Sequence, residues 1–278
     1  ATAVPDFHYF AGRGGKDVIP LYRDAKGTPN VDPKVLDAIT VAHRQADEFA
    51  PPITVEQLFA YVFGVLAGAD YAERFRDALE TPGPRVPLSS DPALFESMAA
   101  HGEQLLWLQT FGERFMDGKG KLPLEGVEWK SEPTRLPDGK AALSYDADTE
   151  TLRVADGILV GVSDEVWRFN VSGMPIISKW LGYRMAKPAG RAASSSSPLD
   201  HIRPTAWVPG WSTELVEVVA VLKETLAMLP AGVALLDEIV AGPLVPADEL
   251  PAPPPALRKP PTKRGDDNDA LFSEEGLA

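Results

Sequence analysis

Residues 142–162 read ALSYDADTETLRVADGILVGV, and this stretch carries the β pattern of the chain. The short segments 142–145 and 151–154 flank a polar stretch from Asp146 to Glu150, which predicts a β-hairpin. Residues 157–162, GILVGV, predict a third strand directly after it. Because short alternating segments separated by turn residues fill residues 119–163, we expect this whole region to be β-rich.

Signals for helix starts dominate the chain before this region. Asp32-Pro33 and Asp91-Pro92 each combine an N-cap Asp with a Pro at the first helical position. Between them, Thr54 and Gln57 have the spacing of a capping box. We expect the helix that starts at Asp91-Pro92 to end near Phe115, and the helical pattern to stop near residue 118.

The remaining helices are predicted from the spacing of apolar residues. One is expected from Asp70, and another follows a Gly turn over Pro175–Arg184. Glu214–Leu229 is strongly amphipathic, and a separate, shorter helix is predicted over Val233–Val240. These patterns predict an α+β fold.

The fold is expected to have three parts. Residues 1–118 are predicted to be mainly helical, residues 119–242 to be β-rich with C-terminal helices packed against the strands, and residues 243–278 to be a disordered tail rich in Pro and charge. The 278 residues contain no Cys, no uninterrupted run of about 18 apolar residues and no export signal at the start. We therefore expect a cytoplasmic protein without disulfides and without a membrane-spanning segment.

The formal net charge of −13 has the wrong sign for a protein that binds nucleic acid, because Lys and Arg contacts to phosphates supply most non-specific affinity. Net charge describes only the average field, however, and binding depends on the local surface. Residues 165–211 hold six basic and two acidic residues, so this segment has a local charge of +4. The basic residues are Arg168, Lys179, Arg184, Lys187, Arg191 and Arg203.

The same segment also contains four of the six Trp residues, Trp167, Trp180, Trp207 and Trp211. Cations interleaved with aromatic residues suit contact with phosphates and with bases or sugars. The alternative is that the Trp residues belong to the core and that the cations form a solvated face. Composition alone leaves both interpretations open.

Several short motifs resemble catalytic signatures only in part. Phe10-Ala11-Gly12-Arg13-Gly14 matches the F-x-G-x-G pattern of amino-methyltransferases, but the residues after it do not predict the helix that this motif needs. Glu128-Trp129-Lys130 and Asp138-Gly139-Lys140 contain half of a nuclease signature, and we interpret both as loop charges. The four His residues lack the spacing of metal ligands. We therefore predict neither a catalytic centre nor a metal site.

Four segments resemble one family in their order along the chain. They are residues 6–22, the helix pair 61–75, the link Pro84-Arg85-Val86-Pro87 and residues 166–184, which read VWRFNVSGMPIISKWLGYR. Together they resemble the C-terminal target-recognition, or specificity, region of Type ISP restriction–modification enzymes, a family of adenine-specific DNA methylases and helicases. Ser172-Gly173-Met174 departs from the Gly-Gly-Tyr that is usual in this family.

The resemblance implies a function in phage defence. It implies that the region from residue 119 recognises an asymmetric site on double-stranded DNA, and that residues 1–118 couple this reader to a DNA methylase/helicase polypeptide. Counterparts of the methylase and helicase domains are not found in these 278 residues, so the chain is expected to be a C-terminal fragment or a split subunit that is not catalytic by itself. S-adenosylmethionine and ATP with Mg²⁺ are then expected only on the other domains.

The candidate DNA contacts follow from the cationic segment and the resemblance. We predict that Arg168, Lys179 and Arg184 hold phosphates or read guanine edges, and that they lie on one face without carboxylate partners. Further candidates are Ser172, Tyr183, Arg13, Lys16 and Arg85. Two other functions remain open: a protein-interaction or scaffold subunit of a DNA-modification complex that never touches DNA, and an enzyme of the methyltransferase or nuclease class.

Overall fold

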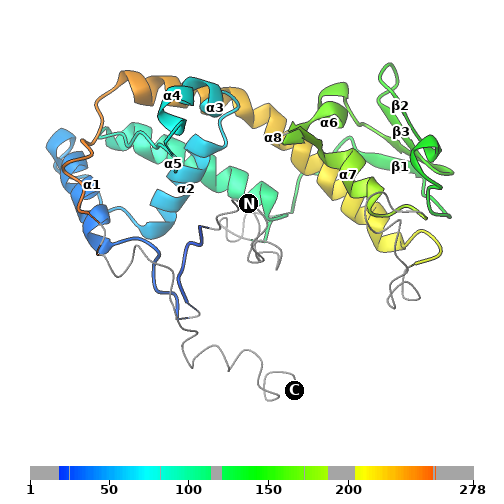
Figure 1. The fold of residues 1–278 in the computed structure, drawn as a ribbon, viewed down its shortest axis with the longest axis horizontal. Helices are drawn as coiled ribbons and strands as arrows, with labels where there is room; N and C mark the ends of the chain where they lie inside the picture. Colours follow the sequence, from blue (N-terminus) through cyan, green and yellow to red (C-terminus); the bar gives the residue numbers. More distant parts are fainter. Residues whose placement is uncertain are drawn as a thin grey trace, which may run out of the picture.

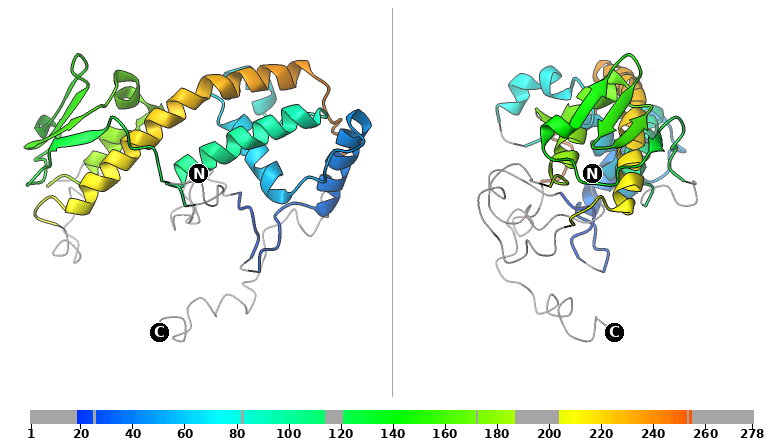
Figure 2. Two further views of the ribbon diagram at one scale, coloured as in Figure 1. Left: turned by 180° about the vertical axis from the view of Figure 1, so that it is seen from behind. Right: turned by 90° about the vertical axis from the view of Figure 1, so that its right-hand side faces the viewer.

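The α+β fold is confirmed by a computed structural model. It describes residues 19–24, 26–81, 83–113, 121–171, 173–186, 204–252 and 254. Most helices gather at one end of an elongated molecule, and the strands lie at the other end together with two short helices (Figure 1). We call residues 19–113 the helical half and residues 121–186 the β half. The long helix α8 (Pro209–Ala241) runs along both (Figure 2).

The helical half is built from segments with the predicted caps. It contains α1 (Pro33–Ala46), α2 (Val55–Leu66), α3 (Tyr71–Arg74), α4 (Arg76–Leu79) and α5 (Pro92–Gln109). The side chains of Asp32 and Asp91 accept hydrogen bonds from backbone N–H groups of the first turns of α1 and α5, and Thr54 and Gln57 form both bonds of the capping box. These three helix starts are confirmed because capping is a local interaction.

Two helix extents predicted from the sequence are wrong. Helix α5 stops at Gln109 rather than near Phe115, because Phe111 and Gly112 take left-handed backbone conformations with φ of 55° and 80°. The helix expected from Asp70 is two short helices, broken at Phe75. The predicted boundary near residue 118 lies within residues 114–120, which are outside the described part.

The core of the helical half lies between α2 and α5. Tyr61 is fully buried there, stacks on Phe95 with ring centroids 4.4 Å apart, and donates a hydrogen bond to the carbonyl oxygen of Pro87. The two helices approach so closely that a Cβ atom at Gly102 would lie 1.9 Å from the carbonyl oxygen of Ala60. Gly102 therefore sets the separation between α2 and α5.

We expect Gly102→Ala to lower the free energy of unfolding by about 2 kcal/mol or more, because the new methyl group forces the backbones of two core helices apart. Gly210→Ala is the matched control, since a Cβ atom at Gly210 meets nothing within 4 Å. Denaturant unfolding of both variants measures the difference. Equal unfolding midpoints for the two variants would contradict the proposed close approach.

The β half is a four-stranded antiparallel sheet with the order β1-β4-β3-β2. The strands are β1 (Glu128–Ser131), β2 (Leu143–Asp146), β3 (Thr151–Val154) and β4 (Gly157–Val160). The register pairs Leu143 with Val154 and Asp146 with Thr151, which confirms the predicted hairpin, and β4 confirms the third strand. Strand β1 was missed: Glu128 and Lys130, interpreted above as loop charges, form an ion pair along this edge strand.

Short elements connect the sheet to the rest of the β half. They are α6 (Asp164–Arg168), β5 (Asn170–Val171), β6 (Met174–Pro175) and α7 (Ile176–Gly182). Helix α7 confirms the helix predicted after the Gly turn, although it is shorter than Pro175–Arg184. Buried residues of the sheet and of α7, Leu152, Leu159, Ile177 and Leu181, form one hydrophobic core with the N-terminal part of α8.

Helix α8 is one continuous helix from Pro209 to Ala241, so the prediction of two separate helices is wrong. Pro230 lies inside it and lacks the N–H of a helical hydrogen bond. The helix continues because residues on both sides of Pro230 are buried. Leu215 and Val219 pack in the core of the β half, whereas Leu236 and Ile239 pack in the core of the helical half.

Helix α8 is also the one helix, among the described residues, that is long and apolar enough to cross a membrane by length and composition, with a mean hydropathy of 1.7. The central helix of a folded domain has the same properties, and the buried residues of α8 pack in the hydrophobic cores described above. The absence of a membrane partner stays a prediction.

The first residues of the predicted tail pack on the helical half. The backbone N–H of Val245 donates to the carbonyl oxygen of Leu88 over 2.8 Å, and the Val245 side chain is buried. Leu250 packs against the same core. The tail beyond residue 254 lies outside the described part.

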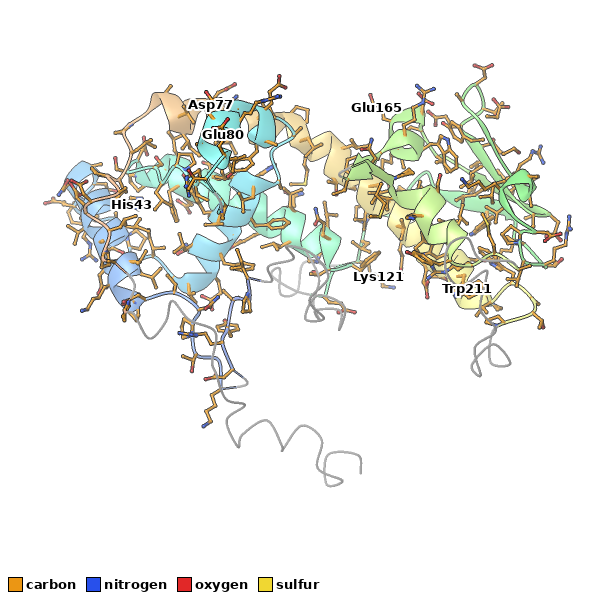
Figure 3. The ribbon with its side chains drawn as sticks, in the orientation of Figure 1. His43, Asp77, Glu80, Lys121, Glu165 and Trp211 are labelled. Carbon is orange, nitrogen blue, oxygen red and sulfur yellow. The ribbon has the colours of Figure 1, made fainter. Side chains whose placement is uncertain are left out.

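Two histidines of the helical half, the buried His43 and the half-buried His101, make its stability depend on pH. His43 of α1, labelled in Figure 3, has a ring nitrogen 3.0 Å from the carbonyl oxygen of Ser89 and an edge-on contact with Phe95. His101 packs against Gly232 of α8. Burial lowers the pKa of both imidazoles below the ordinary value of 6.5. The fold therefore favours the neutral rings.

We expect the free energy of unfolding to fall as the pH drops below 6.5, because the unfolded chain then binds protons that the folded chain excludes. Denaturant unfolding at about pH 7.5 and about pH 5.5 measures the loss. His101→Gln, which removes one titrating ring, should reduce it. An unchanged loss in this variant would show that His101 does not contribute.

Candidate nucleic-acid interface

The β5–β6 hairpin and α7 form a continuous, preformed face. Val171 pairs with Met174 across the hairpin, and the Asn170 side-chain oxygen accepts a hydrogen bond from the N–H of Gly173 over 3.2 Å. Gly173 has a φ of 76°, a left-handed conformation that favours glycine. Strand β6 continues directly into α7 at Ile176. The hairpin therefore fixes where α7 begins.

Helix α7 divides its side chains between core and solvent. Ile177 and Leu181 are fully buried against the sheet and α8, which leaves Lys179 exposed on the outer side. Tyr183, which follows the helix, is 71% exposed. Two of the predicted contacts, Lys179 and Tyr183, are thus exposed to solvent.

A hollow of about 730 Å³ lies between α7, the hairpin and the residues that precede β2. Its walls include two lysines, Lys140 and Lys179, and no carboxylate among the described residues that line it. Trp167 and Met174 supply apolar surface. Lys140 had been interpreted as a loop charge, and nothing in the sequence placed it near Lys179, since 38 residues separate them.

Arg184 has a carboxylate partner and an aromatic partner, contrary to the prediction that it has no carboxylate beside it. Its guanidinium lies 3.6 Å from the ring centroid of Trp180 and 5.5 Å from that of Trp211, and it forms a 2.8 Å ion pair with Glu214 of α8. The same group donates to the carbonyl oxygen of Trp180. The Arg184 side chain is only 22% exposed, and it links α7 to α8 through its contacts with Trp180 and Glu214.

Arg168 is also paired, but at the surface. Its Nε lies 3.1 Å from Asp164 one turn earlier in α6, and its side chain is 74% exposed. The expectation that all three cations lack carboxylate partners is therefore wrong for Arg168 and Arg184. An exposed pair within one helix contributes little to stability and exchanges partners readily. Arg168 thus stays available to a phosphate, whereas Arg184 does not.

The tryptophans of the cationic segment mostly serve the core, which is the alternative interpretation given above. Trp207 is buried, and its ring nitrogen donates to the side chain of Ser212 over 3.0 Å. Trp167 stacks on Tyr145, with ring centroids 5.1 Å apart. Trp180 and Trp211, the latter labelled in Figure 3, pack against the same core. Only Trp167 also lines the hollow.

Of the other predicted contacts, the structure describes only Arg85, and it does not join this face. Arg85 lies between α4 and α5 in the helical half. Its backbone N–H donates a hydrogen bond to the Tyr71 hydroxyl over 2.9 Å, and its carbonyl oxygen accepts one from the same hydroxyl over 2.8 Å. Arg13, Lys16 and Ser172 lie outside the described residues, as does Phe10–Gly14 with its glycine motif. The structure therefore brings together Lys179 and the additional Lys140, which line one hollow, whereas Arg168 and Tyr183 are exposed but do not line it.

Other features of the described residues offer no comparable site. No group of three or more His, Cys, Asp or Glu residues among them could hold a metal ion. A second hollow, of about 270 Å³, is lined by α2 and by residues 19–21 and 30–31, and its walls are almost entirely apolar. The cationic hollow is therefore the stronger candidate for an anionic ligand.

We expect Arg184→Lys to lower the free energy of unfolding by about 1 kcal/mol, because Lys cannot keep the planar stack on Trp180 together with the bond to Glu214. The matched control is Arg168→Lys, which changes an exposed ion pair and should cost less than about 0.5 kcal/mol. Denaturant unfolding measures both. A larger loss in Arg168→Lys than in Arg184→Lys would contradict the proposed link between α7 and α8 through Arg184.

The fold and this face define an α+β domain in which Lys179 of α7 and Lys140, just before β2, line a hollow beside the β5–β6 hairpin. The profile of the Type ISP C-terminal specificity domain matches residues 1–218. The chain therefore belongs to the family of Type ISP C-terminal specificity domains, which confirms the resemblance found in the sequence. A comparison with curated proteins found no significant match.

Solved structures provide a further comparison. The DrdV–DNA complex, determined by cryo-EM, has 17% identity and a TM-score of 0.51, and the match covers 78% of this chain and 20% of that chain. This likeness shows a shared fold. A nuclease-deletion mutant of the Type ISP enzyme LlaGI in complex with a DNA substrate mimic has 19% identity and a TM-score of 0.45, covering 65% of this chain and 14% of that chain.

The ATP-dependent Type ISP enzyme LlaBIII, bound to DNA, has 17% identity and a TM-score of 0.45, covering 75% of this chain and 12% of that chain. This chain thus corresponds to a fifth or less of the length of each of these three proteins. What the whole enzymes do is therefore carried over only as a proposal.

Proposed function

We propose that this chain recognises a specific sequence of double-stranded DNA for a Type ISP restriction–modification system, and that the face of α7 and the β5–β6 hairpin meets the duplex. One observation carries the proposal. The described residues that line the hollow on this face include two lysines and no carboxylate, although the chain as a whole has a net charge of −13. Membership of the specificity-domain family supports it.

The roles of the side chains follow from their exposure. Lys140 and Lys179 neutralise phosphates on the two sides of the hollow, and Arg168 exchanges Asp164 for a third phosphate. Tyr183 offers an exposed ring for packing against a sugar or a base. Arg184 positions α7 rather than touching DNA, because it is already bonded to Glu214.

The proposal assigns the chemistry to other domains. A DNA methylase/helicase polypeptide supplies methyl transfer and translocation, and S-adenosylmethionine and ATP with Mg²⁺ bind there. The helical half forms the coupling surface, and α8 holds the reader rigidly to it. This chain contributes the recognition of the target and works in the cytoplasm, where the DNA is.

The proposal is tested by selecting binders from a library of randomised duplexes with the full chain, followed by titrations of the selected duplex at several salt concentrations. Lys140→Ala and Lys179→Ala should each lower the affinity about eightfold near 0.1 M salt and reduce the slope of log K against log salt by about one, because each removes one phosphate contact.

Lys34→Ala is the matched control, because Lys34 is an exposed lysine at the start of α1 in the helical half. It makes the same change of charge away from the proposed face and should leave the affinity within about twofold. Selection that enriches no sequence, or equal losses in all three variants, would refute the proposed interface. DNA-independent binding to a methylase would then favour the scaffold function.

A further inference from the structure

Two exposed apolar residues of the β half lie directly opposite each other on the β5–β6 hairpin. Among the described residues from 121 to 186, four large apolar side chains are exposed, and three of them are Val171, Met174 and Tyr183. Val171 and Met174 are 54% and 49% exposed and are directly paired across the β5–β6 hairpin. Exposed apolar residues that cluster in this way indicate a surface that a partner covers.

The hairpin is held in place before any partner arrives. The Asn170 side chain accepts a hydrogen bond from the N–H of Gly173 and donates to the carbonyl oxygen of Arg168. The N–H of Ile176 donates to the carbonyl oxygen of Phe169, whose side chain packs against the core. A Cβ atom at Gly173 would meet nothing within 4 Å, so the tip of the hairpin projects into open space.

The surroundings of the hairpin identify the partner as a polyanion. Met174 lines the same hollow as Lys140 and Lys179, and no carboxylate lines it among the described residues. An apolar pair beside uncompensated cations suits a ligand with both apolar groups and phosphates. Duplex DNA has this combination in its major groove, which is wide enough for a two-stranded β-ribbon.

Val171 and Met174 have no side-chain group that donates a strong hydrogen bond, so they cannot read the polar edges of bases. The apolar group that the major groove offers is the C5-methyl of thymine. Resting on the proposed DNA recognition, we propose that the β5–β6 hairpin enters the major groove and that Val171 and Met174 read thymine methyl groups there. Lys140 and Lys179 hold the flanking phosphates and keep the hairpin in register.

The test replaces each thymine of the selected duplex by uracil, which lacks only the C5-methyl group and keeps the same hydrogen-bonding edges. We expect about a fourfold loss of affinity at one or two positions, corresponding to one buried methyl group each. In Val171→Ala or Met174→Ala, replacing the thymine that the substituted side chain contacts should cost nothing further, because that contact is already gone. Met174→Leu should keep the discrimination.

Leu124→Ala is the matched control, because Leu124 is the fourth exposed apolar residue of the β half and lies outside the hairpin. It should keep the full loss on replacement of thymine. Unfolding midpoints show whether each variant is folded, and both hairpin substitutions are at exposed positions.

Failures of the two proposals are distinguishable. If no sequence is selected, the proposed DNA recognition fails, and the reading of thymine fails with it. If a sequence is selected and binding depends on Lys140 and Lys179, the proposed function stands. Three results would then overturn the reading of thymine by Val171 and Met174. They are an affinity unchanged by uracil at every position, a selected site without A·T pairs, and a loss of affinity on replacement of the same thymine that persists in both hairpin variants.

Discussion

Helix α8 supplies buried side chains to every hydrophobic cluster of the described residues, and the rest of the structure depends on this sharing. Its 33 residues span about 50 Å at 1.5 Å per residue. Leu215 lies in the core of the β half, Val221 contacts the small cluster at the end of α5, and Leu236 lies in the core of the helical half. Neither core is complete without this helix, so the two halves form one structure.

The position of the candidate interface follows from the same helix. Helix α7 is attached to α8 by the burial of Ile177 and Leu181 and by the bond from Arg184 to Glu214. Because a planar guanidinium between aromatic rings tolerates little rotation, this attachment fixes the direction in which Lys179 projects. A continuous set of packed contacts therefore connects the helical half to the cations that we propose to contact DNA.

Interactions within a few residues were predictable from the sequence, whereas those between distant segments were not. The capping box of Thr54 and the β2–β3 hairpin depend on neighbours in the chain, and both were predicted. Two separate helices were expected over Glu214–Leu229 and Val233–Val240, but burial on both sides of Pro230 outweighs the local preference of proline, and one helix forms. The pairing of Arg184 spans 30 residues and left no sequence signal, so its freedom from carboxylates was wrongly assumed.

A strongly acidic chain is compatible with the recognition of DNA when one face has cations and no neighbouring carboxylates. When any other face of the protein meets a duplex, long-range repulsion lowers the affinity, because non-specific binding is mostly electrostatic. Short-range contacts then have to supply a larger share of the binding free energy, and these contacts depend on the base sequence. The net charge of −13 with a local hollow of two lysines therefore favours discrimination between sequences over tight binding to all of them.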